Sequence, residues 1–131
     1  MWEINKERRA TRRRRINLEF RVLLVATRKG ADGEEQMLPL IGYTRDISES
    51  GIALVVSAKS MGVLHNLGQS YTLQLVLAIP RGSVELEITP ARYQHISEAD
   101  TSPRFLIGAQ ITKISDEDRE RFVEYLQSLD L

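Results

Sequence analysis

The sequence predicts a mainly β protein, a six-stranded antiparallel β-barrel with one C-terminal α-helix. Apolar and polar residues alternate in several short segments, turn-forming residues separate these segments, and a clear helical pattern appears near the end of the chain. The chain has 131 residues, of which 42% are hydrophobic and 27% charged. This size and composition predict one soluble domain with a single core.

The first half of the chain is predicted to form three strands. Over residues 16–27 the apolar side chains recur at every second position, as in a half-buried strand; they are Ile16, Leu18, Phe20, Val22 and Leu24. The polar stretch 28–36, with Asp32-Gly33, predicts a hairpin turn into a second strand over 37–46. A short buried strand is expected at 52–56, followed over 59–69 by a loop with at most one helical turn.

The second half is predicted to supply the remaining strands. Residues 71–79 alternate in the same way, and Pro80-Arg81-Gly82-Ser83 forms the turn into the next strand, which begins at Val84. Pro90 interrupts this strand, so a bend or a sheet edge is expected there before the chain resumes over 91–96. After a loop at 97–103, the last strand covers 104–114.

A helix is predicted to begin after Ser115, which is a typical N-cap residue. The three residues that follow Ser115 are acidic, as the helix dipole prefers. Further along, one apolar stripe has the spacing i, i+3, i+4, i+7; it consists of Phe122, Tyr125, Leu126 and Leu129. We expect this stripe to pack across the barrel.

The charge distribution separates an N-terminal arm, residues 1–15, from the body, residues 16–131. The arm holds seven basic and two acidic side chains, a net charge of +5, whereas the whole chain is neutral, so the body carries −5. A segment with this many charges cannot join the hydrophobic core. We expect the arm to be flexible until an anion neutralises it. Six of the seven bases are arginines, whose planar fork suits phosphate and guanine edges.

Composition also argues against several kinds of function. The chain has no cysteine and no apolar run that could span a membrane or act as a secretory signal, so it is predicted to be cytoplasmic. His65 and His95 are thirty residues apart and have no metal-ligand spacing, so we expect no metal site and no cofactor. No nucleophile elbow, phosphate loop or zinc-protease motif is present, and we predict that the chain is not an enzyme.

Two polar segments remain as candidates for binding. One is the run Arg8-Arg9-Ala10-Thr11-Arg12-Arg13-Arg14-Arg15, which ends directly before the first strand. The other is Asp46-Ile47-Ser48-Glu49-Ser50-Gly51, which lies between two strands. Taken alone, the first is equally well a solvated basic tail, and the second a polar turn in which Gly51 eases the backbone.

Together the two segments resemble the PilZ domain family, whose members bind the bacterial second messenger cyclic di-GMP. The family carries an R-x-x-x-R segment before its first strand and a D/N-x-S-x-x-G segment entering a later one. Asp46, Ser48 and Gly51 match the second motif at each defined position. The resemblance covers roughly Glu7 to Tyr125 and extends to the later strands, including the one with Arg92. It implies the barrel and terminal helix that the periodicity predicts.

The register of the arginine motif departs from the family pattern. The family's last motif arginine usually directly precedes the first strand, which would be Arg15, yet Thr11 stands four residues earlier. The spacing is met instead by Arg8 with Arg12 and by Arg9 with Arg13. The resemblance therefore implies a cyclic di-GMP site formed by Arg8, Arg9, Arg12, Arg13, Asp46, Ser48 and Gly51, with Arg15 as a competitor for the second motif position.

The expected function is that of a receptor that changes conformation on binding cyclic di-GMP and signals to a protein partner. Arginine can pair with phosphates and with guanine O6 and N7, and an ionised Asp46 can accept from the guanine N1 and N2 donors. Two alternatives stay open: a PilZ-like module that binds proteins but no ligand, and a small barrel that binds nucleic acid. The acidic body, with 6% aromatic residues, argues against the second. No membrane insertion is expected.

Overall fold

The computed structural model describes residues 15–29, 35–67, 71–96 and 103–129. Seven strands and two helices follow one another along these residues. They are β1 (Ile16–Asn17), β2 (Arg21–Lys29), β3 (Glu35–Ile47), β4 (Gly51–Ser57), α2 (Ala58–Leu67), β5 (Thr72–Ile79), β6 (Gly82–Ile96), β7 (Arg104–Lys113) and α3 (Asp116–Leu129).

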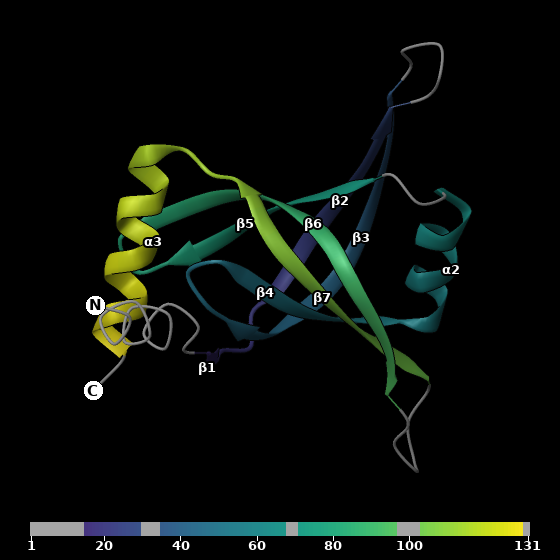
Figure 1. The fold of residues 1–131 in the computed structure, drawn as a ribbon, viewed down its shortest axis with the longest axis horizontal. Helices are drawn as coiled ribbons and strands as arrows, with labels where there is room; N and C mark the ends of the chain where they lie inside the picture. The colour runs from purple at the N-terminus through teal and green to yellow at the C-terminus, as the bar shows by residue number, and fades with distance from the viewer. Residues whose placement is uncertain (1–14, 30–34, 68–70, 97–102, 130–131) are drawn as a thin grey trace, which may run out of the picture.

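Six of the strands close into an antiparallel barrel, which confirms the predicted fold class (Figure 1). Around the ring, β2 pairs with β5, β5 with β6, β6 with β7, β7 with β4, β4 with β3, and β3 again with β2. The two-residue β1 adds to β3 beside Asp46 and Ile47. Figure 1 shows α3 at one end of the barrel and α2 at the other.

The inward side chains of the strands form one apolar core, as the alternation predicts. Burial alternates strictly along β5, and the side chains of Leu24, Leu73 and Ile88 are fully buried. Helix α3 closes the core with Phe122 and Leu126, which are 1% and 5% exposed, and Tyr125 packs against them. Leu129, the last member of the predicted stripe, is 39% exposed and lies outside this seal. Ser115 caps α3 as predicted, because its Oγ accepts a hydrogen bond from the Asp118 N–H at 3.1 Å.

The predicted first strand over 16–27 is corrected by the structure, which divides it into β1 and β2. The buried Thr44 of β3 causes the division. Its hydroxyl accepts from the Phe20 N–H at 2.8 Å and donates to the Leu18 carbonyl at 2.6 Å, so a side chain replaces part of the strand ladder. The apolar alternation runs on through this gap, and for that reason the pattern indicated a single strand.

The predicted loop at 59–69 is also corrected, because residues Ala58–Leu67 form the helix α2. Ser57 caps the helix by accepting a hydrogen bond from the Ser60 N–H at 3.1 Å. Leu64 is fully buried, and Met61 and Val63 pack beside the core. Gly62, which indicated a loop, faces open space in this helix, where a glycine is tolerated.

Pro90 lies within one continuous strand, β6, and beside a shift in the register between β6 and β7. The pairing of β6 with β5 ends at Ile88, so β6 has no β5 partner at Pro90, in keeping with a residue that lacks an N–H. The shift falls between Pro90 and Arg92, and it changes how the following side chains face.

Candidate functional site

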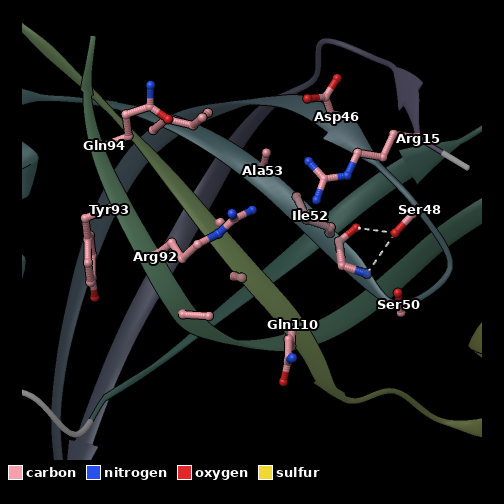
Figure 2. Close-up of a pocket in the computed structure, with 15 residues that line it drawn as sticks. Arg15, Asp46, Ser48, Ser50, Ile52, Ala53, Arg92, Tyr93, Gln94 and Gln110 are labelled. Atoms are coloured by element: carbon pink, nitrogen blue, oxygen red, sulfur yellow. Dashed lines mark hydrogen bonds between the residues drawn. The ribbon is translucent and has the colours of Figure 1, made fainter. Parts of the chain in front are cut away.

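A polar cleft with a volume of about 680 Å³ opens where β3, β4, β6 and β7 meet. It contains four of the eight predicted binding residues, namely Arg15, Asp46, Ser48 and Gly51. The other residues that line it are Ser50, Ile52, Ala53, Ala91, Arg92, Tyr93, Gln94, Leu106, Gly108, Ala109 and Gln110. Residues 46–51 and Arg15 thus share one cleft with the second half of β6, far from them in the sequence (Figure 2).

The turn between β3 and β4 is held by Ser48, which is 7% exposed. Its Oγ accepts a hydrogen bond from the Gly51 N–H at 3.1 Å and lies 3.3 Å from the Gly51 carbonyl, to which it donates (Figure 2). The Ser48 N–H donates to the same carbonyl at 2.9 Å. The serine hydroxyl therefore orders the turn that presents Asp46 and Ser50 to the cleft.

Gly51 is required by the close approach of β7. A Cβ added at Gly51 would lie 2.9 Å from the carbonyl oxygen of Ala109, a contact that real Cβ atoms essentially never make. The neighbour is backbone and cannot turn aside as a side chain would. Any larger residue would separate β4 from β7 at the floor of the cleft.

We expect Gly51→Ala to destabilise the protein by about 1–3 kcal/mol, because the added methyl group forces two paired strands apart. Gly62→Ala is the matched control. Its Cβ meets nothing within 4 Å in the middle of α2, so it should stabilise the fold by about 0.5–1 kcal/mol. Denaturant unfolding of both variants measures the difference, and equal stability of the wild type and Gly51→Ala would contradict the close approach.

Arg92 reaches the cleft from β6 and lies across β7. It pairs with Gly108, and a Cβ at Gly108 would be 3.7 Å from Arg92 Nε and 3.8 Å from one terminal guanidinium nitrogen. The glycine thus leaves room for the arginine to lie flat over the strand. The register shift after Pro90 brings Arg92 opposite Gly108.

The guanidinium groups of Arg15 and Arg92 extend into the same space from opposite sides (Figure 2). Among the residues that the structure describes, neither arginine forms an ion pair with a carboxylate. Asp46 lies at the edge of the cleft and is half-buried. Two planar cations with no carboxylate partner in the described part of the chain, beside one carboxylate, have the chemistry to pair with an anion that also offers hydrogen-bond donors.

The remaining predicted binding residues, Arg8, Arg9, Arg12 and Arg13, lie outside the described residues. Arg92 was absent from the predicted set although it belongs to the segment that resembles the family. The sequence held one signal for it: a proline two residues before the arginine, in a strand expected to bend. The matching glycine, Gly108, comes from the next strand and is recognised only through the pairing.

Tyr93 connects the cleft to a buried tyrosine. Its hydroxyl is hydrogen bonded to that of Tyr71, which is 7% exposed and begins the segment that leads into β5. Burial raises the pKa of Tyr71 well above its ordinary range, and the hydrogen bond with Tyr93 raises it further. Tyr71 therefore stays protonated at neutral pH, and its hydrogen bond holds Tyr93 at this edge of the cleft.

Within the described ranges, no group of three or more His, Cys, Asp or Glu side chains is placed to hold a metal ion. No helix in the described part of the chain is long and apolar enough to span a bilayer.

Comparison with known proteins gives a consistent family and fold. The family described as PilZ domain matches residues 7–128. No curated protein matches the chain. Solved structures with the same fold include PlzA of Borreliella burgdorferi in complex with c-di-GMP, with a TM-score of 0.60 and 13% identity over 98% of this chain and 56% of that one.

Two further structures are similar at low identity. Apo MrkH of K. pneumoniae has a TM-score of 0.56 and 19% identity, covering 89% of this chain and 50% of that one. The Bacillus subtilis inhibitor of motility, MotI/DgrA, has a TM-score of 0.55 and 18% identity, and the match covers 90% of this chain and 52% of that one. The chain thus spans about half the length of these proteins, and the likeness concerns the fold. Because the family pattern covers nearly the whole sequence, the chain belongs to the PilZ domain family.

Proposed function

We propose that this chain is a cytoplasmic receptor for cyclic di-GMP and acts without catalysis of its own. The PilZ family typically binds this dinucleotide. The observation that carries the proposal is the cleft in which Arg15 and Arg92 converge beside the Asp46–Gly51 turn. Its volume of about 680 Å³ lies within the range of small-molecule sites, roughly 300–1,000 Å³.

The chemistry of the cleft suits the ligand. Cyclic di-GMP carries two phosphates and two guanines, and a guanidinium can pair with phosphate oxygens, pair with guanine O6 and N7, or stack on a purine face. Asp46 would accept from the guanine N1 and N2 donors, an arrangement that adenine does not offer. In this assignment Ser48 and Gly51 contribute by shaping the turn that carries Asp46.

The arm supplies the further cations of the proposed site. Arg8, Arg9, Arg12 and Arg13 precede Arg15, which already lines the cleft, so each is within a few residues of it along the chain. Folding of the arm over the ligand would change the surface that the protein shows to a partner, and this change is the proposed signal. Ordering the arm offsets part of the contact energy, so we expect an affinity on the order of micromolar.

Isothermal titration of cyclic di-GMP into the purified chain tests the proposal. GTP and cyclic di-AMP, each titrated separately, are the controls. We expect saturable binding that is selective for the guanine dinucleotide. Asp46→Ala should reduce this selectivity and weaken binding by about tenfold or more, because a bidentate contact to a base edge contributes roughly 1–3 kcal/mol of discrimination.

Asp116→Ala is the control for Asp46→Ala. Asp116 is exposed in the first turn of α3 and does not line the cleft, so its removal should leave the affinity unchanged. A folded wild-type chain that releases no heat at ligand concentrations far above micromolar would refute the receptor function. That result would favour a PilZ-like module that binds proteins alone.

A further inference from the structure

A second concave surface lies on the outside of the barrel, between β2, β5, β6 and the start of α3. It has a volume of about 590 Å³. Leu23, Val25 and Val76 form part of its floor, and Glu85, Glu87 and Asp118 contribute acidic side chains to it. We call this surface the acidic groove.

The floor of the acidic groove exposes large apolar side chains to solvent. Leu23 is 60% exposed and Val76 50% exposed, although both lie on strands in the middle of a closed barrel. On the β6 side of the floor the paired residues are acidic: Val76 pairs with Glu85, and Gln74, two residues before Val76, pairs with Glu87. On the β3 side, Leu23 pairs with the exposed Ile41. An apolar floor with an acidic border suits a segment that combines large apolar side chains with basic ones.

The negative charge at this border is largely uncompensated. Asp118 is paired with Arg121 and accepts a hydrogen bond from the Glu85 N–H. Among the described residues, however, no ion pair involves the side chains of Glu85 or Glu87. Among the described residues that line the groove, Lys113 is the one basic side chain, and it pairs with Glu87 across β6 and β7. Two carboxylates are thus available to cations supplied from elsewhere.

The chain itself contains a segment with the required composition. Trp2 and Ile4 are the large apolar residues near the beginning of the arm, and Lys6, Arg8 and Arg9 follow within five positions of Ile4. The arm carries a net charge of +5 and the body −5. Apolar and charge complementarity therefore both favour the arm as the occupant of the groove.

The arm is also long enough to reach the groove from its attachment point. Arg15 lines the polar cleft together with Arg92, whereas Glu87, five residues earlier on the same strand, lines the acidic groove. Five strand residues span about 17 Å. The thirteen residue-to-residue steps from Trp2 to Arg15 can extend over roughly 43 Å, more than twice that distance.

We propose that residues 1–7 bind in the acidic groove of their own chain. Trp2 and Ile4 pack against Leu23 and Val76, and Lys6 faces Glu85 and Glu87. Such docking would hold the middle of the arm close to the polar cleft and raise the local concentration of its arginines there. The docking itself does not depend on the ligand, and only this last consequence rests on the proposed function.

Trp2 makes the docking directly measurable, because it is the single tryptophan of the chain. In the ligand-free protein we expect tryptophan emission at shorter wavelength than in an unfolded control, with reduced quenching by acrylamide. Leu23→Lys should remove this protection, because it replaces an apolar contact with a charge that repels the arm. We expect about a tenfold fall in the ratio of docked to undocked arm.

Met37→Lys is the matched control. Met37 is 61% exposed on β3 and does not line the acidic groove, so the same substitution there should leave the Trp2 signal unchanged. Circular dichroism verifies that both variants are folded. A wild-type Trp2 as accessible as in the unfolded chain, or one unaffected by Leu23→Lys, would overturn the proposal. Protection that disappears on dilution would overturn it as well, by showing that the groove receives the arm of a second copy.

Discussion

Replacing Arg92 with alanine is expected to weaken cyclic di-GMP binding by about 100-fold. The guanidinium has no acidic partner among the described residues and lies over Gly108 inside the polar cleft. Hydrogen bonds to charged groups contribute roughly 1.5–3 kcal/mol each, and each 1.4 kcal/mol changes a dissociation constant about tenfold. Loss of two such bonds gives the expected effect, which titration calorimetry measures.

Two further variants separate a specific contact from a general loss of charge. Arg92→Lys keeps the positive charge but removes the planar fork, so its affinity should fall between those of the wild type and Arg92→Ala. Arg119→Ala removes an exposed arginine of α3 that does not line the cleft, and it should bind normally. If Arg119→Ala weakened binding as much as Arg92→Ala, the effect would be long-range electrostatics, and the assigned contact would be wrong.

Replacing Phe122 with alanine is expected to destabilise the fold by about 3–5 kcal/mol, which is the usual cost of removing a buried phenylalanine. Phe122 is 1% exposed and is the largest fully buried side chain among the residues that the structure describes. It packs with Leu126 where α3 closes the barrel, so its removal leaves a cavity at the junction of helix and sheet. Denaturant unfolding monitored by circular dichroism measures the loss.

Leu129→Ala provides the comparison on the same helix. Leu129 is 39% exposed and lies outside the buried cluster, so its truncation should change stability by no more than about 0.5–1 kcal/mol. If the two substitutions lowered the free energy of unfolding equally, α3 would stabilise the fold through its helical propensity rather than through the packing of Phe122 in the core.

The architecture could be predicted because its cause is local. Alternation of period two appears wherever a strand has one buried face, as from Leu73 to Ile79. The Ser115 cap and the stripe through Phe122 and Leu126 likewise belong to a single continuous segment. Asp46, Ser48 and Gly51 were recognised for the same reason, since their motif is six residues long.

The two wrong predictions, a single strand over 16–27 and a loop over 59–69, have long-range causes that do not appear in the periodicity of the sequence. Thr44 lies more than twenty residues from Phe20, yet its hydroxyl replaces the strand ladder there and separates β1 from β2. Helix α2 depends on the burial of Leu64 against the barrel, which outweighs a glycine in its middle. In both places a tertiary contact decides the local conformation.

By itself, then, the sequence determined the strands apart from the break between β1 and β2, the terminal helix, the charged arm and the family motif, because each depends on neighbouring residues. Only the tertiary structure decided which residues line the same cleft. The pairing of β6 with β7 sets Arg92 over Gly108, and barrel closure brings both beside Arg15 and the Asp46–Gly51 turn. These residues are distant along the chain, and strand register is fixed by the packing of the whole core rather than by any one segment.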